Sequence, residues 1–269
     1  MSLTEHTSSF TKRFGVMLLA GMPGILALSG YIYLTTPPTT LPPGLSLPLF
    51  TVSAAVNSLL LLAVACLVRT YTAPRVGLPS YILDWARTGD DVWRRLRPEV
   101  RPAMVLGVIG GLLILLLDVA LAPFVAQDVP QSAIGATDRT VMNVLAYAPV
   151  RFLYGGITEE LLLRYGRLSA LAFIGWILTG RQSGGLGSGV MWTAIVISAV
   201  LFGIGHLPAL AQSVTLTPVL VARTILLNAI AGVLFGWLYW QRSLEAAMVS
   251  HAAFHVPLVA LSLVQVALL

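Results

Sequence analysis

Most side chains that could do chemistry in this sequence lie within long apolar stretches. Two are adjacent carboxylates, Glu159 and Glu160, in the segment ITEELLLRYG, and the others are three of the four histidines, His206, His251 and His255. A charge at the centre of a lipid bilayer costs about 2.5–3.5 kcal/mol on insertion scales. Each ionisable residue at that depth therefore indicates a function, and acid–base or metal chemistry is what these residue types supply.

The two carboxylates are expected to have different surroundings. Glu160 and Arg164 are four residues apart, so on a helix they share one face and can form an ion pair. Glu159 lies about 100° around the helix and has no such partner. A lone carboxylate in a low dielectric holds a proton more strongly, which suits a general base or acid working near neutral pH. The alternative is a purely structural ion-pair cluster of all three residues.

The histidines belong to two further segments. In LFGIGHLPAL, Phe202 and His206 are one helical turn apart, and Pro208 ends the helix just beyond. In SLEAAMVSHAAFH, His251 and His255 are spaced i, i+4 and project from one face of a helix. A single histidine in a helix is usually a core residue, but three in apolar segments with an unpaired glutamate favour a site.

Two chemistries fit this set of residues. In one, Glu159 deprotonates a water that attacks a peptide carbonyl, while the histidines orient the water and stabilise the oxyanion. In the other, zinc is held by His206, His251 and His255, or by two of them and Glu159, and lowers the pKa of bound water to about 7. The spacing H-x-x-x-H suits a metal, although it lacks the internal glutamate of the zinc-protease motif.

The elements that position these residues are membrane spans, which need about 20 apolar residues each. Hydrophobic residues make up 57% of the 269 positions and charged residues 10%, and the mean hydropathy is +0.86. Soluble domains carry about 25% charged residues, so we predict an all-α, polytopic transmembrane helix bundle. The predicted spans are 14–34, 46–68, 103–126, 141–180, 190–207, 217–240 and 243–269. The fourth is too long for one straight span, which leaves either a separate interfacial or re-entrant helix at 141–154 or eight spans.

Charge indicates the orientation. The net charge is +5, and Lys12 is the only lysine among sixteen basic residues. Arginines concentrate in 69–101, where we expect a short surface helix flanked by coil. The positive-inside rule places this loop and the N-terminus in the cytoplasm, with the protein in the plasma membrane. The expected partners are the lipid bilayer and a membrane-associated peptide or protein, and no nucleic acid. Access to the site is expected from the cytoplasmic side.

The order of these motifs resembles a known family. The pattern E-E-x-x-x-R at Glu159, Glu160 and Arg164 is followed by F-x-x-x-H and then by S-L-x-A-x-x-x-x-H, which ends at His251. Over about residues 145–260, this arrangement is similar to the CPBP family, the CAAX protease and bacteriocin-processing intramembrane endopeptidases. That family includes the Ras-converting CAAX endopeptidase.

The resemblance implies a role for each residue. Glu159 would be the general base, His206 would help to hold the attacking water, and Glu160 with Arg164 would fix the helix. His251 would stabilise the oxyanion together with His255, a position where the family usually has asparagine or a similar polar residue. No cofactor is implied with certainty, and zinc is possible.

The same reasoning divides the chain into a cytoplasmic tail (1–13), N-terminal spans (14–140) that include the arginine-rich loop, and a CPBP-like catalytic core (141–269). Three further charged residues near membrane depth, Asp118, Arg151 and Arg223, are expected to pair with one another or to face the interface. Two other functions fit these patterns: a non-catalytic scaffold or bacteriocin self-immunity protein, and a proton-coupled transporter, since glutamate and histidine also form proton relays.

Overall fold

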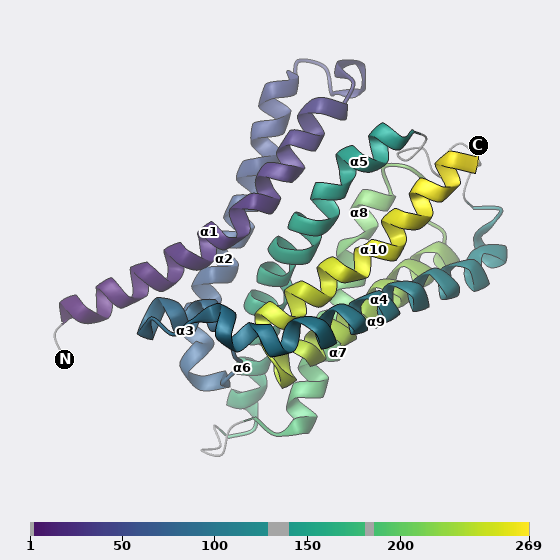
Figure 1. Cartoon of the computed structure of the whole chain (residues 1–269). Helices are drawn as coiled ribbons and strands as arrows, with labels where there is room; N and C mark the ends of the chain where they lie inside the picture. The colour runs from purple at the N-terminus through teal and green to yellow at the C-terminus, as the bar shows by residue number, and fades with distance from the viewer. Residues whose placement is uncertain (1–2, 129–139, 181–185, 269) are drawn as a thin grey trace.

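The chain is a bundle of long helices (Figure 1). The computed structural model describes residues 3–128, 140–180 and 186–268, and no strand occurs among them. Residues 1–2, 129–139, 181–185 and 269, which belong to the predicted tail, spans and core, lie outside the described part. Seven helical segments there are long and apolar enough to cross a membrane: Phe10–Thr35, Leu47–Thr72, Val92–Val125, Val141–Leu178, Ser188–Leu210, Pro218–Gln241 and Leu244–Leu268. The predicted all-α polytopic bundle is confirmed.

The helices begin and end where the local sequence requires it. After α1 (Leu3–Thr35), α2 (Leu47–Val76) starts behind Ser46 and ends at Gly77, whose φ is +62°. Further along the chain, α9 (Pro218–Gln241) begins directly after its N-cap residue Thr217, whose hydroxyl accepts a hydrogen bond from the backbone N–H of Leu220. Serine and threonine at these positions satisfy backbone donors that have no partner inside the helix. Proline in the first turn of α9 is tolerated because its missing N–H is not needed there.

The arginine-rich loop contains the short helix that we expected, α3 (Tyr81–Thr88). The loop between the two long helices is shorter than predicted, because α2 continues to Val76 and α4 (Val92–Val125) begins at Val92 instead of residue 103. Asp91 explains this early start, since its carboxylate accepts hydrogen bonds from the backbone N–H groups of Trp93 (2.9 Å) and Arg94 (3.1 Å).

The long apolar segment at 141–180 forms one continuous helical span. It consists of α5 (Val141–Pro149), the π-helical stretches η2 (Val150–Glu159) and η3 (Leu161–Leu168), and α6 (Ser169–Leu178). Within the described residues it is neither split into a separate helix at 141–154 nor divided into two spans. π-Helical turns are rare, and they occur frequently at functional sites. Here Glu159 is the last residue of η2, and Glu160 lies between η2 and η3.

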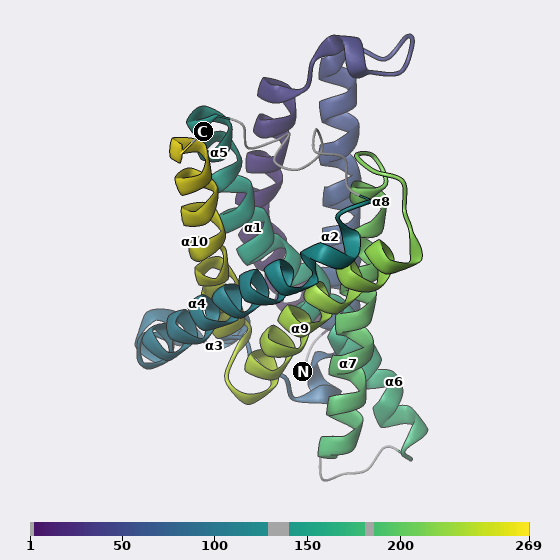
Figure 2. The ribbon, with the colours of Figure 1, turned by 90° about the vertical axis from the view of Figure 1, so that its right-hand side faces the viewer.

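Small residues let the C-terminal helix pack closely. Helix α10 (Leu244–Leu268) packs against α4, and α9 packs against α7 (Ser188–Gly205); in Figure 2 the helices of each pair cross at an angle. A side chain at Gly107 or Gly111 of α4 would meet the backbone carbonyl of Ser250 or Phe254 in α10. Glycine at such points allows helix backbones to approach each other in a membrane.

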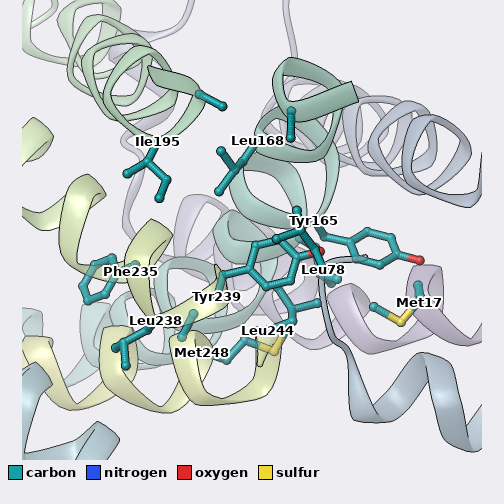
Figure 3. Close-up of a cluster of buried hydrophobic side chains, with 14 of the residues drawn as sticks. Met17, Leu78, Tyr165, Leu168, Ile195, Phe235, Leu238, Tyr239, Leu244 and Met248 are labelled. Atoms are coloured by element: carbon teal, nitrogen blue, oxygen red, sulfur yellow. The ribbon is translucent and has the colours of Figure 1, made fainter. Parts of the chain in front are cut away.

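Beside the site, an apolar core joins several helices. Figure 3 shows side chains of α9 and α10, among them Phe235, Tyr239 and Leu244, gathered with Tyr165 and Leu168 of η3. All of these side chains are buried. The core fixes η3, α9 and α10 relative to one another, and these are the elements next to the ionisable residues.

A hydrogen-bonded network ties α3 to the start of α10. The Glu245 carboxylate accepts hydrogen bonds from the Ser80 hydroxyl (2.8 Å) and from the backbone N–H groups of Tyr81 (3.0 Å) and Ile82 (2.9 Å). The Tyr81 hydroxyl donates to Glu99 (2.8 Å). Burial, followed by this hydrogen bond, raises the pKa of Tyr81 to about 12, so the phenol keeps its proton and remains a donor.

Candidate active site

One cavity of about 340 Å³ brings the predicted site together. Glu159 comes from the end of η2, His206 follows α7, and His251 and His255 lie on α10. All four line this cavity although up to 96 residues separate them in the chain. The short helix α8 (Leu207–Leu210) begins directly after His206, so the preceding span ends early, as a shared site requires.

Glu159 faces the cavity, and its carboxylate makes no hydrogen bond or ion pair with the residues that the structure describes. It also lines a second cavity of about 400 Å³, together with His206, Leu28 of α1 and Arg167 of η3. The carboxylate therefore lies where two cavities meet. This is the unpaired glutamate that the sequence predicted.

Glu160 points away from the cavity into the bundle. It is fully buried, and its Oε1 is 2.9 Å from Nη1 of Arg164, as the i, i+4 spacing predicted. The same oxygen is 2.7 Å from Nδ1 of His251, a contact that the sequence did not predict. Arg164 also donates to the backbone carbonyl of Gly232 (3.2 Å). Glu160 therefore joins the helix that carries Glu159 to the helix that carries His251.

Aromatic rings enclose this buried group. The Arg164 guanidinium lies 5.1 Å from the ring centroid of Phe202 and 5.2 Å from that of Phe235. The His251 ring stacks on Phe235 with centroids 4.3 Å apart. Such cation–π contacts stabilise a charge where water is excluded. They also fix the plane of the imidazole.

His206 is oriented by the turn that ends α7. Its Nδ1 is 2.9 Å from the backbone carbonyl oxygen of Phe202, and the two rings meet edge to face with centroids 4.6 Å apart. A carbonyl only accepts, so Nδ1 carries the proton and donates it. In the neutral ring Nε2 is then an acceptor. His206 lines both cavities.

His255 and His251 approach the glutamate helix at a glycine. A Cβ on Gly155 would lie 2.8 Å from Nε2 of His255 and 3.8 Å from Nε2 of His251. Both Nε2 atoms therefore lie close to η2, one turn before Glu159. Nδ1 of His255 is buried without a hydrogen-bond partner. Sequence reasoning missed Gly155, and its only signal was a pair of glycines just before the carboxylates.

Two of the three other charged residues also line the main cavity, namely Asp118 and Arg151, and Asn228 lines it as well. Asp118 pairs with Arg223 across α4 and α9, which confirms the expectation of pairing among these residues. Arg151 lies over the ring of Tyr147, 5.2 Å from its centroid. These side chains extend the polar part of the cavity beyond the predicted set.

The side chains present do not fit a zinc ion. In the part of the chain that the structure describes, no three histidine, cysteine, aspartate or glutamate side chains are grouped as metal ligands. This includes the candidates His206, His251, His255 and Glu159. We therefore derive no catalytic step through a metal.

The cavity lies in the half of the bundle remote from the arginine-rich loop, and access from the cytoplasmic side stays a prediction. On α4 it is lined by Ile114, Leu115 and Asp118, in the half of that helix remote from the arginine-rich loop. On the span Val141–Leu178 the lining residues fall between 147 and 159, again in the remote half. At the arginine-rich end, α3 is joined to the start of α10 by its hydrogen bonds to Glu245. Loop charge reports orientation, but helix packing decides where a cavity lies.

Comparison with known protein families agrees with the geometry. Residues 141–256 match the family model described as "Type II CAAX prenyl endopeptidase Rce1-like". Residues 141–256 form an Rce1-like domain of the CPBP family. No curated protein and no solved structure matches the chain. The Rce1-like domain contains Glu159, His206, His251 and His255, and at the family level it supports membrane protease activity. The resemblance inferred from the motifs is confirmed.

Proposed function

We propose that this multi-pass membrane protein is an intramembrane endopeptidase that hydrolyses a peptide bond of a membrane-associated protein or peptide. One observation carries the proposal: Glu159, His206, His251 and His255 come from three separate helices and line one cavity. The Rce1-like domain supplies the reaction class. The division into N-terminal spans (14–140) and catalytic core (141–269) belongs to the proposal.

Glu159 and His206 activate the water. Both the Glu159 carboxylate and Nε2 of His206 accept hydrogen bonds, so a water between them donates both of its hydrogens. Its lone pairs then face the peptide carbonyl. Glu159 takes one proton as the water oxygen bonds to the carbonyl carbon, and it returns this proton to the leaving amine.

His251 and His255 stabilise the oxyanion through Nε2. The buried Nδ1 of His255 has no partner, so the proton belongs on Nε2, which becomes a donor. Nδ1 of His251 is 2.7 Å from Oε1 of Glu160, and this contact orients the ring. Donors placed in advance around a developing oxyanion lower the barrier by about 2.7–4 kcal/mol each.

Glu160 acts through His251 and does not touch the substrate. Its Oε1 lies between Nη1 of Arg164 and Nδ1 of His251, and the carboxylate is fully buried. It therefore fixes the orientation of the imidazole, as outer-shell carboxylates do for catalytic histidines. Arg164 neutralises it. Both are positioning residues in this mechanism.

The proposed location is the plasma membrane, with the N-terminus in the cytoplasm. Ser188 and Thr215 are exposed at opposite ends of the span Ser188–Leu210 and its loop. In a Cys66→Ser background, an impermeant maleimide should label Thr215→Cys in intact cells, and Ser188→Cys only after permeabilisation. The reverse pattern would overturn this orientation.

Cleavage of matched peptides tests the activity. The purified protein in lipid nanodiscs is given two quenched fluorescent peptides of one sequence ending in a C-A-A-X motif, one with a farnesylated cysteine and one without. We expect cleavage that is lost in Glu159→Gln. Preference for the farnesylated peptide would define the substrate class further. The catalytic proposal fails if the wild type cleaves neither peptide, or if Glu159→Gln and Glu160→Gln both keep activity. The non-catalytic scaffold and the proton-coupled transporter would then be the functions to test.

A further inference from the structure

Three arginines form a stripe along one face of α4, far from the catalytic cavity in the sequence. Arg94, Arg97 and Arg101 are spaced i, i+3 and i+7 in the first three turns of this helix, so they lie within about 60° of one another around its axis. All three are exposed, and they are called the arginine stripe below. Within the residues that the structure describes, their side chains take part in no hydrogen bond or ion pair.

The acidic residues of the same region have other partners. Asp84 and Asp90 lie 2.7 Å and 3.7 Å from Nη1 of Arg95, which is not part of the stripe. Asp91 caps the start of α4, and Glu99 accepts hydrogen bonds from hydroxyl groups in α3 and just before α10. Acids and bases alternate in the sequence, but the fold pairs every carboxylate of residues 69–101 elsewhere. The arginine stripe therefore keeps three positive charges that these carboxylates do not neutralise.

The arginine stripe ends where the lipid-facing surface of α4 begins. Beyond Arg101 the exposed side chains are apolar, as at Met104, Val105 and Ile109. With 34 residues, α4 is about 51 Å long at 1.5 Å per residue, whereas the hydrocarbon core of a bilayer is about 30 Å thick. The first turns of α4 therefore extend past the hydrocarbon, and the arginine stripe lies at the depth of the lipid headgroups.

Exposed tryptophans mark the same depth. The side chain of Trp93 is 61% exposed and lies one turn from Arg97 on the same side of α4. On α3, Trp85 is also exposed, and the ammonium group of Lys12 lies 5.9 Å from the centroid of its ring. Tryptophan is enriched at membrane–water interfaces because its ring is apolar and its N–H is polar. Aromatic and basic side chains thus occur together at this end of the bundle.

We propose that the arginine stripe is a docking surface for the headgroups of anionic phospholipids. A guanidinium can donate two parallel hydrogen bonds to the oxygens of one phosphate. Phosphatidylcholine carries this phosphate too, but its quaternary ammonium cancels the charge and is repelled by the arginines. Phosphatidylglycerol keeps its negative charge, which the unneutralised stripe attracts. This inference is independent of the proposed peptidase activity.

Native mass spectrometry of the full-length protein in detergent measures this binding one lipid at a time. The protein is titrated with phosphatidylglycerol or with phosphatidylcholine of the same acyl chains, and the two apparent Kd values are compared. The variants are Arg97→Gln alone, all three stripe arginines changed to glutamine, and all three changed to lysine. Arg242→Gln is the matched control for the single variant, because Arg242 is an exposed arginine that follows α9 and lies outside the stripe.

We expect the wild type to bind phosphatidylglycerol more tightly than phosphatidylcholine by a factor on the order of 100, from roughly fivefold per arginine. Arg97→Gln should lower this ratio about fivefold, and the triple glutamine variant should abolish it. Arg242→Gln should keep the ratio, and the triple lysine variant should keep most of it because the charge remains.

Equal binding of the two lipids by the wild type, or an unchanged ratio in the triple glutamine variant, overturns the proposal. An equal fall in Arg97→Gln and Arg242→Gln also overturns it, since any exposed arginine would then serve as well. The two single variants keep the test decisive if the triple glutamine variant does not fold.

Discussion

Glu245 and Glu159 both lie in helices of membrane-spanning length, and their surroundings are opposite. Glu245 is 3% exposed and accepts three hydrogen bonds from Ser80, Tyr81 and Ile82 at the start of α3. Glu159 has none among the described residues and faces the junction of two cavities. A carboxylate whose oxygens are saturated fixes structure, whereas one left unsaturated beside a cavity is available for proton transfer.

The largest expected effect separates these two glutamates. Glu159→Gln keeps the shape of the side chain and removes the base, so activity should fall by roughly 10²- to 10⁴-fold while the melting temperature hardly changes. Glu245→Gln should do the reverse, with lower stability and retained turnover. Cys66 is the only cysteine and is buried, so a thiol-reactive dye reports unfolding. Equal loss of activity in both variants would break the comparison.

The second prediction concerns Glu160, which combines both kinds of surroundings. Glu160→Gln leaves the buried Arg164 without its counter-charge and weakens the contact with His251, so we expect a loss of roughly 3–5 kcal/mol in stability. The dye-based melting curve measures it. Activity per folded molecule should also fall, because the His251 ring is no longer fixed. A variant with wild-type melting would contradict the assignment of Glu160 to positioning.

The third prediction concerns the approach of α10 to η2. Gly155→Ala puts a methyl group 2.8 Å from Nε2 of His255 and so displaces the oxyanion donors. A displacement of about 1 Å can reduce the rate roughly 10²-fold. Gly189→Ala is the control, since a Cβ there meets nothing within 4 Å. If Gly155→Ala cleaves the fluorescent peptides as the wild type does, the histidines do not act at this point.

The smallest effect is expected for His255→Asn. Asparagine is the residue that the family usually has at this position, and its amide N–H can replace Nε2–H as an oxyanion donor. We expect activity to remain within roughly tenfold of the wild type, because one donor replaces another. A zinc site would lose a ligand and most of its activity. Stoichiometric zinc in the purified protein, together with an inactive His255→Asn, would replace the metal-free mechanism.

What the sequence determined by itself is local. Apolar length located all seven spans, the i, i+4 rule paired Glu160 with Arg164, and the unpaired Glu159 followed from the same helix geometry. The span at 141–180 stayed ambiguous because its π-helical turns leave no mark in hydropathy. The early start of α4 was missed because the cap at Asp91 outweighs the arginines and prolines that follow it.

Only the tertiary structure decided which helices face one another. The contact between Glu160 and His251 joins residues 91 positions apart, and the pair of Asp118 and Arg223 joins residues 105 positions apart. Both depend on how the helices pack against one another, and a small-residue motif in one helix does not identify its partner helix. The same packing placed Arg151 in the cavity and Gly155 against the histidines. Residue spacing fixes the faces of one helix, but the relative position of two helices depends on all the side chains between them.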